Sequence, residues 1–321
     1  MKIGISGTNY KVIRMRGFLK NFDILLRLKV IGGILTALTL LGFLARIHVL
    51  MEMIVCFRVS YFYLLLFCSV PFFFKKEWLW ASAFLAASLI NFLQFGHLYF
   101  EAEKSDTAAT DRILIFNVYS ANKNHQALID YINKTDPDHI VLVEVNSRWA
   151  SAINDGLREK YPHSVVVPRI DNFGILLRSK KPFESEVIDL YGVPVISAQF
   201  DKFKILAVHP LPPRNGIYFE DRNKQLKMIS DLIQLDKNTM ICGDLNTVPW
   251  SPFFKDLVSQ NNLKLSSKGQ GVCTTWPSNI PFLRIPIDHC LLTTEGNVQS
   301  YKRGPDLGSD HFPLLIDFSF N

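Results

Sequence analysis

Cysteine is scarce in this chain, and its pattern is not that of a metal ligand set. None of the five cysteines lies in a CxxC pair or at the spacing of zinc ligands, which argues against a structural zinc fold. Internal repeats and low-complexity tracts are also lacking, which argues against a solenoid. A disulfide between Cys273 and Cys290 stays open if they lie in an oxidising compartment.

Basic residues are not in excess where a nucleic-acid-binding domain would need them. Residues 1–104 hold 12 of the 35 Lys and Arg against 5 of the 29 Asp and Glu, which leaves 23 against 24 for residues 105–321. The net charge of +6 therefore belongs to the first third. Because a basic footprint should lie on the binding domain itself, this charge does not mark the C-terminal part as a nucleic-acid binder.

Long apolar runs are confined to residues 30–100, although 48% of the whole chain is hydrophobic. Runs of about 20 residues can each cross a bilayer as a helix, and we expect three spans, over 30–50, 54–74 and 78–97. Arg46 and Arg58 lie near span ends, from which their side chains can reach the membrane interface. Two spans with one run lying in the interface is the alternative.

The distribution of Lys and Arg predicts the orientation of these spans. Residues 1–29 are rich in Lys and Arg, and Lys75 and Lys76 lie between the second and third spans. The positive-inside rule then places both segments in the cytoplasm. We therefore expect a multi-pass protein of a bacterial plasma membrane: a basic N-terminus (1–29), three spans (30–100), a polar linker (101–111) and a periplasmic or extracellular domain (112–321).

The C-terminal part alternates short apolar runs with helical patterns, which predicts an α/β domain. We expect strands over 113–118, 140–145, 165–167, 174–177, 187–190, 195–200, 203–208, 240–243, 287–292 and 314–318. Helices are expected over 125–134, 149–160, 221–235 and 252–261, and a hairpin turn at Asp201-Lys202. Many strands with few helices predict two packed sheets with helices outside.

Polar side chains gather at the ends of these apolar strands, where loops on a rigid sheet usually carry catalytic groups. They are Asn117, Glu144, His209, Asp244 with Asn246, Asp288, and Asp310 with His311. Attack on a phosphate ester needs stabilised non-bridging oxygens, an activated water and a stabilised leaving oxygen. Oxygen ligands holding Mg²⁺ or Mn²⁺, with a His oriented by an Asp, can supply these requirements.

The motifs GDLN, PIDH and the terminal GSDH, together with the strand-end Asn and Glu, resemble the endonuclease/exonuclease/phosphatase superfamily. That superfamily includes DNase I-like nucleases, inositol polyphosphate 5-phosphatases and sphingomyelinases. The TWP…PIDH pattern is most similar to its bacterial membrane-anchored members. The resemblance covers about residue 112 to the C-terminus and implies a four-layer α/β sandwich with two mixed sheets and outer helices.

The resemblance also implies a metal site with three contributors. Glu144 matches the principal metal-binding carboxylate of the family. Asn117 matches the neighbouring residue that helps to bind metal and phosphate, and Asp310 matches an acidic residue near the metal. The implied cofactor is Mg²⁺ or Mn²⁺.

Five further residues match catalytic positions of the family. Asp244 matches the Asp that orients or deprotonates the attacking water, and Asn246 the carboxamide that positions phosphate. His311 matches the His that contacts the scissile phosphate, and Asp288 the Asp that orients it. His209 matches a His that contacts phosphate or assists the leaving group in nuclease-like members.

Two positions match less closely and are expected to contact substrate. Asn172 lies in DNFGILLRS, which resembles a strand start of the family, and Arg222 lies in a helix motif near the site. The chain also departs from the family where Val143 replaces the common Gln before Glu144, which leaves the metal ligand itself in place.

The sequence thus predicts a membrane-anchored, metal-dependent hydrolase of phosphate mono- or diesters. Nucleic acid, a phospholipid head group and a small phosphorylated metabolite all stay open as substrates, with the lipid bilayer as a second partner. The alternative is a catalytically inactive, membrane-tethered scaffold domain of the same fold. A pseudoenzyme is expected to lose Glu144, Asp244 or His311, and the chain keeps all three.

Overall fold

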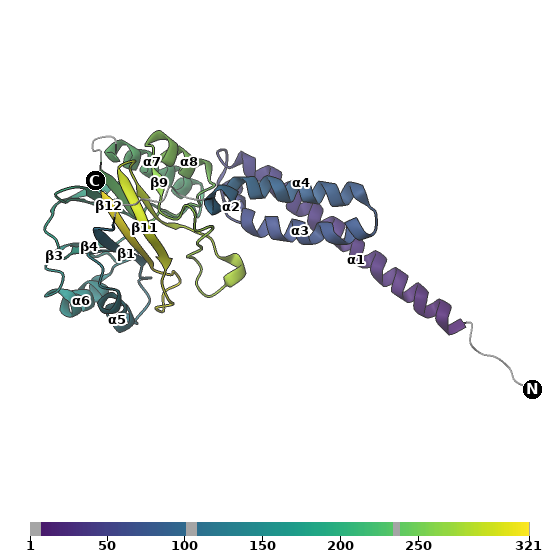
Figure 1. Cartoon of the computed structure of the whole chain (residues 1–321), viewed down its shortest axis with the longest axis horizontal. Coiled ribbons are helices and arrows are strands. Elements are labelled where there is room, and N and C mark those ends of the chain that lie inside the picture. The colour runs from purple at the N-terminus through teal and green to yellow at the C-terminus, as the bar shows by residue number, and fades with distance from the viewer. Residues whose placement is uncertain (1–7, 101–107, 234–237, 321) are drawn as a thin grey trace, which may run out of the picture.

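The computed structural model describes residues 8–100, 108–233 and 238–320, and side chains from residue 24 onward. It has two parts, a helical segment (residues 8–99) and a C-terminal domain (residues 111–320), which lie end to end in Figure 1. The predicted linker 101–111 lies mostly outside the described residues.

The helical segment consists of a long helix and a helical hairpin that run side by side (Figure 1). Its elements are α1 (Thr8–Leu41), η1 (Gly42–Leu44), α2 (Val49–Val55), α3 (Arg58–Phe74), α4 (Trp78–Phe95) and η2 (Gly96–Tyr99). Leu65, Phe72 and Phe84 pack between the helices, while many other apolar side chains point outward. An apolar outer surface is typical of helices that face lipid.

Within the described part of the chain, two helices are long and apolar enough to cross a membrane, Ile24–Leu44 and Trp78–Tyr99. A third span results only if α2 and α3, which meet at an angle of 61°, are counted as one. The prediction that Arg58 reaches the membrane interface is wrong. Arg58 is 3% exposed, and its Nη1 donates to Asn91 Oδ1 inside the helical segment, at 3.2 Å. Arg46 pairs with Asp256 of the C-terminal domain.

Two six-stranded mixed sheets form the C-terminal domain, in the orders β11-β12-β1-β2-β4-β3 and β5-β6-β7-β8-β10-β9. The first comprises β1 (Asp111–Asn117), β2 (His139–Val143), β3 (His163–Val167), β4 (Ile175–Ser179), β11 (Gly296–Arg303) and β12 (Leu314–Phe320). The second comprises β5 (Glu184–Leu190), β6 (Val193–Gln199), β7 (Lys204–Val208), β8 (Thr239–Asp244), β9 (Lys264–Leu265) and β10 (Asp288–Leu292).

Helices cover the outer face of each sheet. They are α5 (His125–Thr135) and α6 (Ser147–Leu157) on the first sheet, and α7 (Gly216–Ile233) and α8 (Pro252–Gln260) on the second; η3 (Pro281–Leu283) lies in a loop. Alternation along β1 explains the layers, because Ile113 and Ile115 point between the sheets while Leu114 and Phe116 point toward α5 and α6. The predicted four-layer sandwich is confirmed.

The structure adds two strands that the sequence did not reveal, β9 and β11. β11 lies at a sheet edge and is mostly half-exposed, so it lacks an apolar pattern. Cys273 and Cys290 are not bridged, since all five cysteines are free. Cys290 instead faces Cys242 on the neighbouring strand β8, with the two sulfurs 3.4 Å apart.

Candidate active site

One edge of the sandwich collects the predicted strand-end residues from both sheets. β1 and β2 are parallel, as are β7 and β8, so their carboxyl ends lie together. Asn117 and Asp244 are the last residues of β1 and β8, and Glu144 and His209 directly follow β2 and β7. Asp288 opens β10, antiparallel to β8 and paired with Asp244. The sheet topology therefore brings motifs that are far apart in the sequence together in one cluster.

Tight backbone geometry positions site residues from both sheets. Gly243 has a φ of 148°, and a Cβ there would lie 1.9 Å from the carbonyl oxygen of Val208, so only glycine fits before Asp244. Glu144 and Asn246 adopt φ values of 61° and 49°, and Asn172 one of 69°. Non-glycine residues rarely occupy this region, and such strain concentrates at functional sites.

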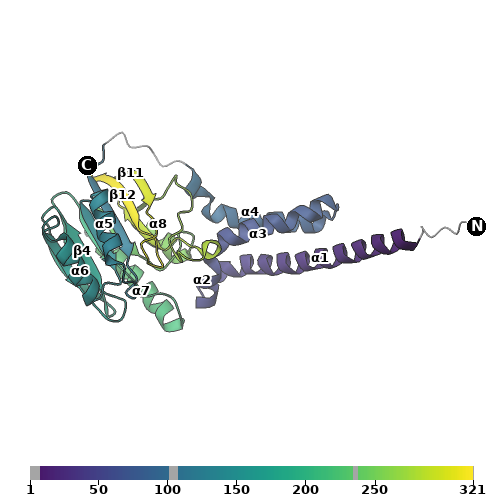
Figure 2. The ribbon, with the colours of Figure 1, turned by 90° about the horizontal axis from the view of Figure 1, so that it is seen from below.

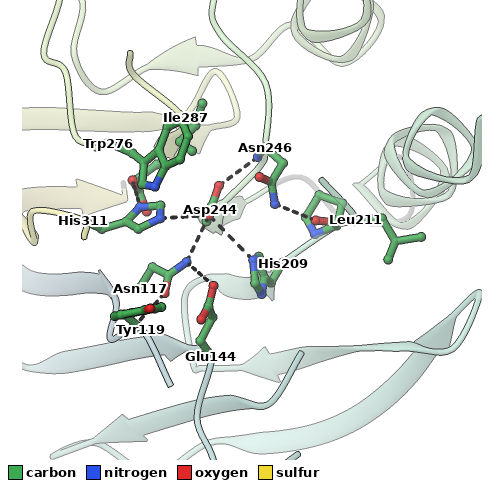
Figure 3. Close-up of polar contacts among 12 residues, drawn as sticks. Asn117, Tyr119, Glu144, His209, Leu211, Asp244, Asn246, Trp276, Ile287 and His311 are labelled. Atoms are coloured by element: carbon green, nitrogen blue, oxygen red, sulfur yellow. Dashed lines mark hydrogen bonds and ion pairs between the residues drawn. The ribbon is translucent and has the colours of Figure 1, made fainter. Parts of the chain in front are cut away.

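Asp244 lies at the centre of the cluster (Figure 3). Its Oδ2 accepts a hydrogen bond from Asn117 Nδ2 at 3.1 Å and lies 3.6 Å from His209 Nε2 and 3.7 Å from His311 Nε2. Its Oδ1 accepts from the backbone N–H of Asn246 at 2.9 Å. A carboxylate from one sheet thus faces a carboxamide and two imidazoles.

His311 is held from two sides. Its Nδ1 lies 2.8 Å from Asp288 Oδ2, so the ring presents Nε2 to Asp244. The Ser309 hydroxyl donates to the Asn117 carbonyl at 2.7 Å and accepts from the His311 N–H at 3.0 Å. The serine of the GSDH motif therefore ties the last loop to β1.

Glu144 lies on the other side of Asn117 from Asp244. Asn117 Nδ2 also donates to Glu144 Oε1 at 3.2 Å, and the backbone N–H of Ser120 donates to Oε2 at 3.2 Å. The Ser120 hydroxyl donates to Asn172 Oδ1 at 2.5 Å, which places Asn172 beside Glu144. Glu144 and Asn172 are partly exposed, so this side of the cluster is open.

Burial and mutual charge shift the pKa values in the cluster. Burial, together with the adjacent Asp288 carboxylate, raises the pKa of Asp244 to about 7. Burial opposes charge on His311, but the neighbouring carboxylates, Asp288 foremost, together outweigh it and raise the pKa of His311 to about 9. Burial and the His311 charge lower the pKa of His209 to about 3, and burial raises that of Glu144. Strongly shifted neighbours of opposite character are typical of acid–base chemistry.

Arg222 does not reach the open side of the site, in contrast to its expected contact with substrate. It is 0% exposed, and its guanidinium donates to Glu52 Oε1 at 3.0 Å and to the Asn246 carbonyl at 3.2 Å. The Asn246 side chain donates to the Pro210 carbonyl at 2.9 Å. Arg222 therefore contacts the backbone of a site residue and not the open side of the site.

Trp276 lies at the site but was not among the predicted site residues. Its Nε1 donates to Asp310 Oδ2 at 3.0 Å, and its ring lies 6.3 Å from that of His311. The TWP…PIDH pattern, which contains Trp276, could have identified it from the sequence. Ser120, which had no sequence signal, was also missed. His289 points to the other face of β10, where its Nε2 lies 2.8 Å from the Thr247 carbonyl.

Two groups of side chains have the chemistry to hold a cation. Asp244, Asp288 and His311 offer ligand atoms within 4.8 Å of one another. His311 and Asp288 already hydrogen-bond each other, so a cation there would replace that bond. Glu144 and Asp310, whose charges interact, avoid this conflict, and the buried Oδ1 of Asp310 has no hydrogen-bond partner among the described residues. Carboxylate and carboxamide oxygens suit Mg²⁺ or Mn²⁺, so this second set fits better.

The four-layer sandwich, with carboxylates, carboxamides and imidazoles gathered at one edge, has the architecture of a phosphoesterase. The chain belongs to the Endonuclease/Exonuclease/phosphatase family, whose model matches residues 114–311. A search of curated proteins found no match.

Solved structures share the fold at low sequence identity. The 3′ phosphatase NExo from Neisseria, bound to a product DNA hairpin, is 16% identical with a TM-score of 0.57, over 66% of this chain and 100% of that chain. The human Nocturnin catalytic domain is 20% identical with a TM-score of 0.53, over 68% and 97%. D. rerio TDP2 with a single-stranded DNA product is 16% identical with a TM-score of 0.53, over 65% and 98%.

Proposed function

We propose that this chain is a membrane-anchored, divalent-metal-dependent hydrolase of phosphate mono- or diesters. One observation carries the proposal. Asp244 Oδ2 lies 3.6 and 3.7 Å from two imidazole Nε2 atoms, one of which is oriented by Asp288. A structural role alone does not account for two buried carboxylates and two buried histidines at one sheet edge, because each costs desolvation energy.

The chain's own residues divide the chemistry among them. Asp244, with a pKa of about 7, suits acceptance of a proton from the attacking water near neutral pH. His311, with a pKa of about 9, carries a positive charge that can face the phosphoryl oxygens. Asn117 and Asn246 offer carboxamides on either side of Asp244, and neutral His209 is placed to contact the phosphate or the leaving group.

The metal is assigned to Glu144 and Asp310, with Asn117 assisting. A bound Mg²⁺ or Mn²⁺ neutralises charge on the phosphoryl group. Burial raises the pKa of Glu144, and a bound cation would favour its charged form. Asp310 is oriented by the Trp276 indole, and its other oxygen, which has no hydrogen-bond partner in the described ranges, is available to a cation.

The membrane assignment is supported by the ends of the helices. Lys29 Nζ lies 2.6 Å from Glu77 Oε2, so the basic N-terminal flank adjoins the Lys75–Lys76 loop at one end of the helical segment. The C-terminal domain lies at the other end (Figure 1). If the helices span a bacterial plasma membrane, the positive-inside rule places this domain in the periplasm or outside the cell. Protease accessibility of the domain in intact cells tests this, and protection throughout would contradict it.

Hydrolysis by the full-length protein in detergent tests the chemistry. Bis-p-nitrophenyl phosphate and p-nitrophenyl phosphate separate diesterase from monoesterase activity, each with Mg²⁺, with Mn²⁺ and with a chelator. DNA, RNA, phospholipids, inositol phosphates and nucleotides then define the substrate class. Two of the similar solved structures hold DNA products, which makes nucleic acid one arm of the panel. We expect metal-dependent turnover of at least one substrate.

The matched control distinguishes this activity from contamination. Asp244→Asn should abolish turnover, while Asp256→Asn, a change of the same chemistry on the partly exposed surface of α8, should retain it. A folded wild-type protein that hydrolyses no substrate with either metal would refute the hydrolase and favour the scaffold alternative.

A further inference from the structure

The helical segment contributes a buried carboxylate to the C-terminal domain. Glu52 of α2 is 2% exposed, and its Oε1 lies 3.0 Å from Nη2 of Arg222 on α7. The same oxygen accepts from the hydroxyl of Ser251 at 2.8 Å, whose oxygen also caps the first turn of α8 by accepting from Phe253 N–H. One oxygen of α2 thus joins two helices of the domain. Figure 2 shows α2 beside the end of the domain that carries α7.

An apolar cluster joins the same two parts of the chain, and the ion pair itself is almost fully buried. Val55 and Phe95 of the helical segment pack with Val248, Trp250 and Ile287 of the domain in one buried cluster. The Trp250 indole donates to the Val55 carbonyl at 2.7 Å. A buried ion pair of this kind is costly to break, because removal of one partner leaves an uncompensated charge.

Arg222 connects Glu52 to the active site through two hydrogen bonds of its guanidinium. Its Nη1 donates to the carbonyl of Asn246 at 3.2 Å, while its Nη2 is held by Glu52. Asn246 adopts a φ of 49°, and its N–H donates to Asp244 Oδ1. An outside support is needed to keep a strained residue in place. Glu52 is the only carboxylate whose oxygen contacts Arg222 in the part of the chain described.

We propose that Glu52 is a positioning residue for the active site: it fixes the Arg222 guanidinium, which holds the Asn246 carbonyl and thereby aligns Asn246 and Asp244. The site is therefore complete only while α2 is docked on the domain. This inference rests on the proposed hydrolase function for its kinetic consequence. Its structural consequence, a mobile 244–251 loop when Glu52 is lost, stands independently.

Variants of the full-length protein in detergent separate positioning from stability. Glu52→Ala removes the counter-ion, and Glu52→Gln removes only its charge. The pair Glu52→Met with Arg222→Met replaces the buried ions by apolar side chains of similar length, which often restores stability. Asp256→Asn is the matched control, because the Arg46–Asp256 pair joins the same two parts at an exposed position.

Turnover of bis-p-nitrophenyl phosphate with Mn²⁺ is the first readout. We expect Glu52→Ala to lower kcat at least tenfold with KM changed less than threefold, Glu52→Gln to fall between it and wild type, and Asp256→Asn to stay within twofold. The double Met variant should recover the Tm of wild type but not its kcat. Recovery of kcat together with Tm, or an unchanged kcat in Glu52→Ala, would overturn the proposal.

Backbone hydrogen exchange of the peptide 244–251 is the second readout, and it needs no substrate. We expect exchange at least fivefold faster in Glu52→Ala and in the double Met variant, and unchanged in Asp256→Asn. Equal exchange in all variants would refute the positioning role even if the wild type proved inactive. An inactive wild type with faster exchange in Glu52→Ala would instead refute only the hydrolase function.

Discussion

Two buried polar clusters, one in each part of the molecule, differ in how completely their side chains are hydrogen-bonded. In the helical segment, Asn91 is 0% exposed and satisfied: it donates to Thr39 Oγ1 and the Ala87 carbonyl and accepts from Arg58. In the C-terminal domain, the buried carboxylates Asp244 and Asp288 lie close enough to share a ligand site, and Asp288 Oδ1 has no hydrogen-bond partner among the described residues.

The difference separates residues that stabilise from residues that react. A satisfied buried amide lowers the free energy of the folded chain and is neutral toward chemistry. Crowded carboxylates and strained backbone cost stability and persist where they serve a site. Substitutions in the two parts should therefore affect different measurements.

The largest effect is expected for Asp244→Asn. The amide cannot accept a proton from water, and it adds an N–H toward the imidazoles, so kcat should fall about 1000-fold or more. The same change removes repulsion from Asp288, so the Tm should be equal to or above that of wild type. Initial rates and thermal unfolding in the same detergent measure both. Lost activity with a lower Tm would place Asp244 among the stabilising residues instead.

Asp288→Asn should have the next largest effect. Asp288 holds His311 Nδ1 at 2.8 Å and favours its positive charge. Without the carboxylate the ring loses its fixed orientation, and we expect kcat to fall about 100-fold, or about 2.7 kcal/mol, with little change in KM. His311→Ala measured alone and with Asp288→Asn provides the check: if the two act as a unit, the double variant is no slower than His311→Ala. Additive losses would contradict the pairing.

Most of the fold was predictable because each strand and helix carries its own local pattern. The α5 helix begins at His125 as predicted, and β6 and β7 pair across the turn expected at Asp201-Lys202. β11 was not predictable, because only Gly296 and Tyr301 of its eight residues are buried. The short helix α2 was not predicted, because it covers the break expected between the first two spans and its apolar residues extend the patterns on both sides.

The site was predictable where residue type and strand end coincide, as for Asn117 and Asp244. Roles that depend on contacts across the chain were not. Arg222 is separated from its partner Glu52 by 170 positions, so no local pattern indicates that the guanidinium is buried beneath the site. The TWP motif could have indicated that Trp276 lies near the site. Its hydrogen bond to Asp310 could not be predicted, because it depends on how two loops pack.

Asn91→Ala should affect the helical segment alone. It leaves the buried Arg58 without its amide partner, and we expect a loss of about 2 kcal/mol in the free energy of unfolding. Turnover per folded molecule should stay within twofold of wild type. Ser82→Ala, an exposed position on the same helix α4, is the control and should change neither quantity. Chemical unfolding in detergent followed by tryptophan fluorescence measures the difference. A large loss of turnover in the folded fraction would break the separation between the two parts.

The smallest effect is expected for Asp111→Asn, at the opposite end of β1 from the site. Burial opposes charge on Asp111, but hydrogen bonds from His139, at 2.8 Å, and Lys181 lower its pKa from 3.8 to about 2. A carboxylate whose folded pKa is depressed adds stability above its unfolded pKa and loses it as pH falls. Because Lys181 is half-exposed, solvent screens part of the interaction, and we expect Asp111→Asn to lower the free energy of unfolding by about 1 kcal/mol at pH 7.

The Tm difference between wild type and Asp111→Asn should shrink as pH falls from 4 toward 2, whereas Asp201→Asn, at an exposed turn, should show no difference at any pH. A gap that persists at pH 2 would mean that packing, and not charge, makes Asp111 stabilising.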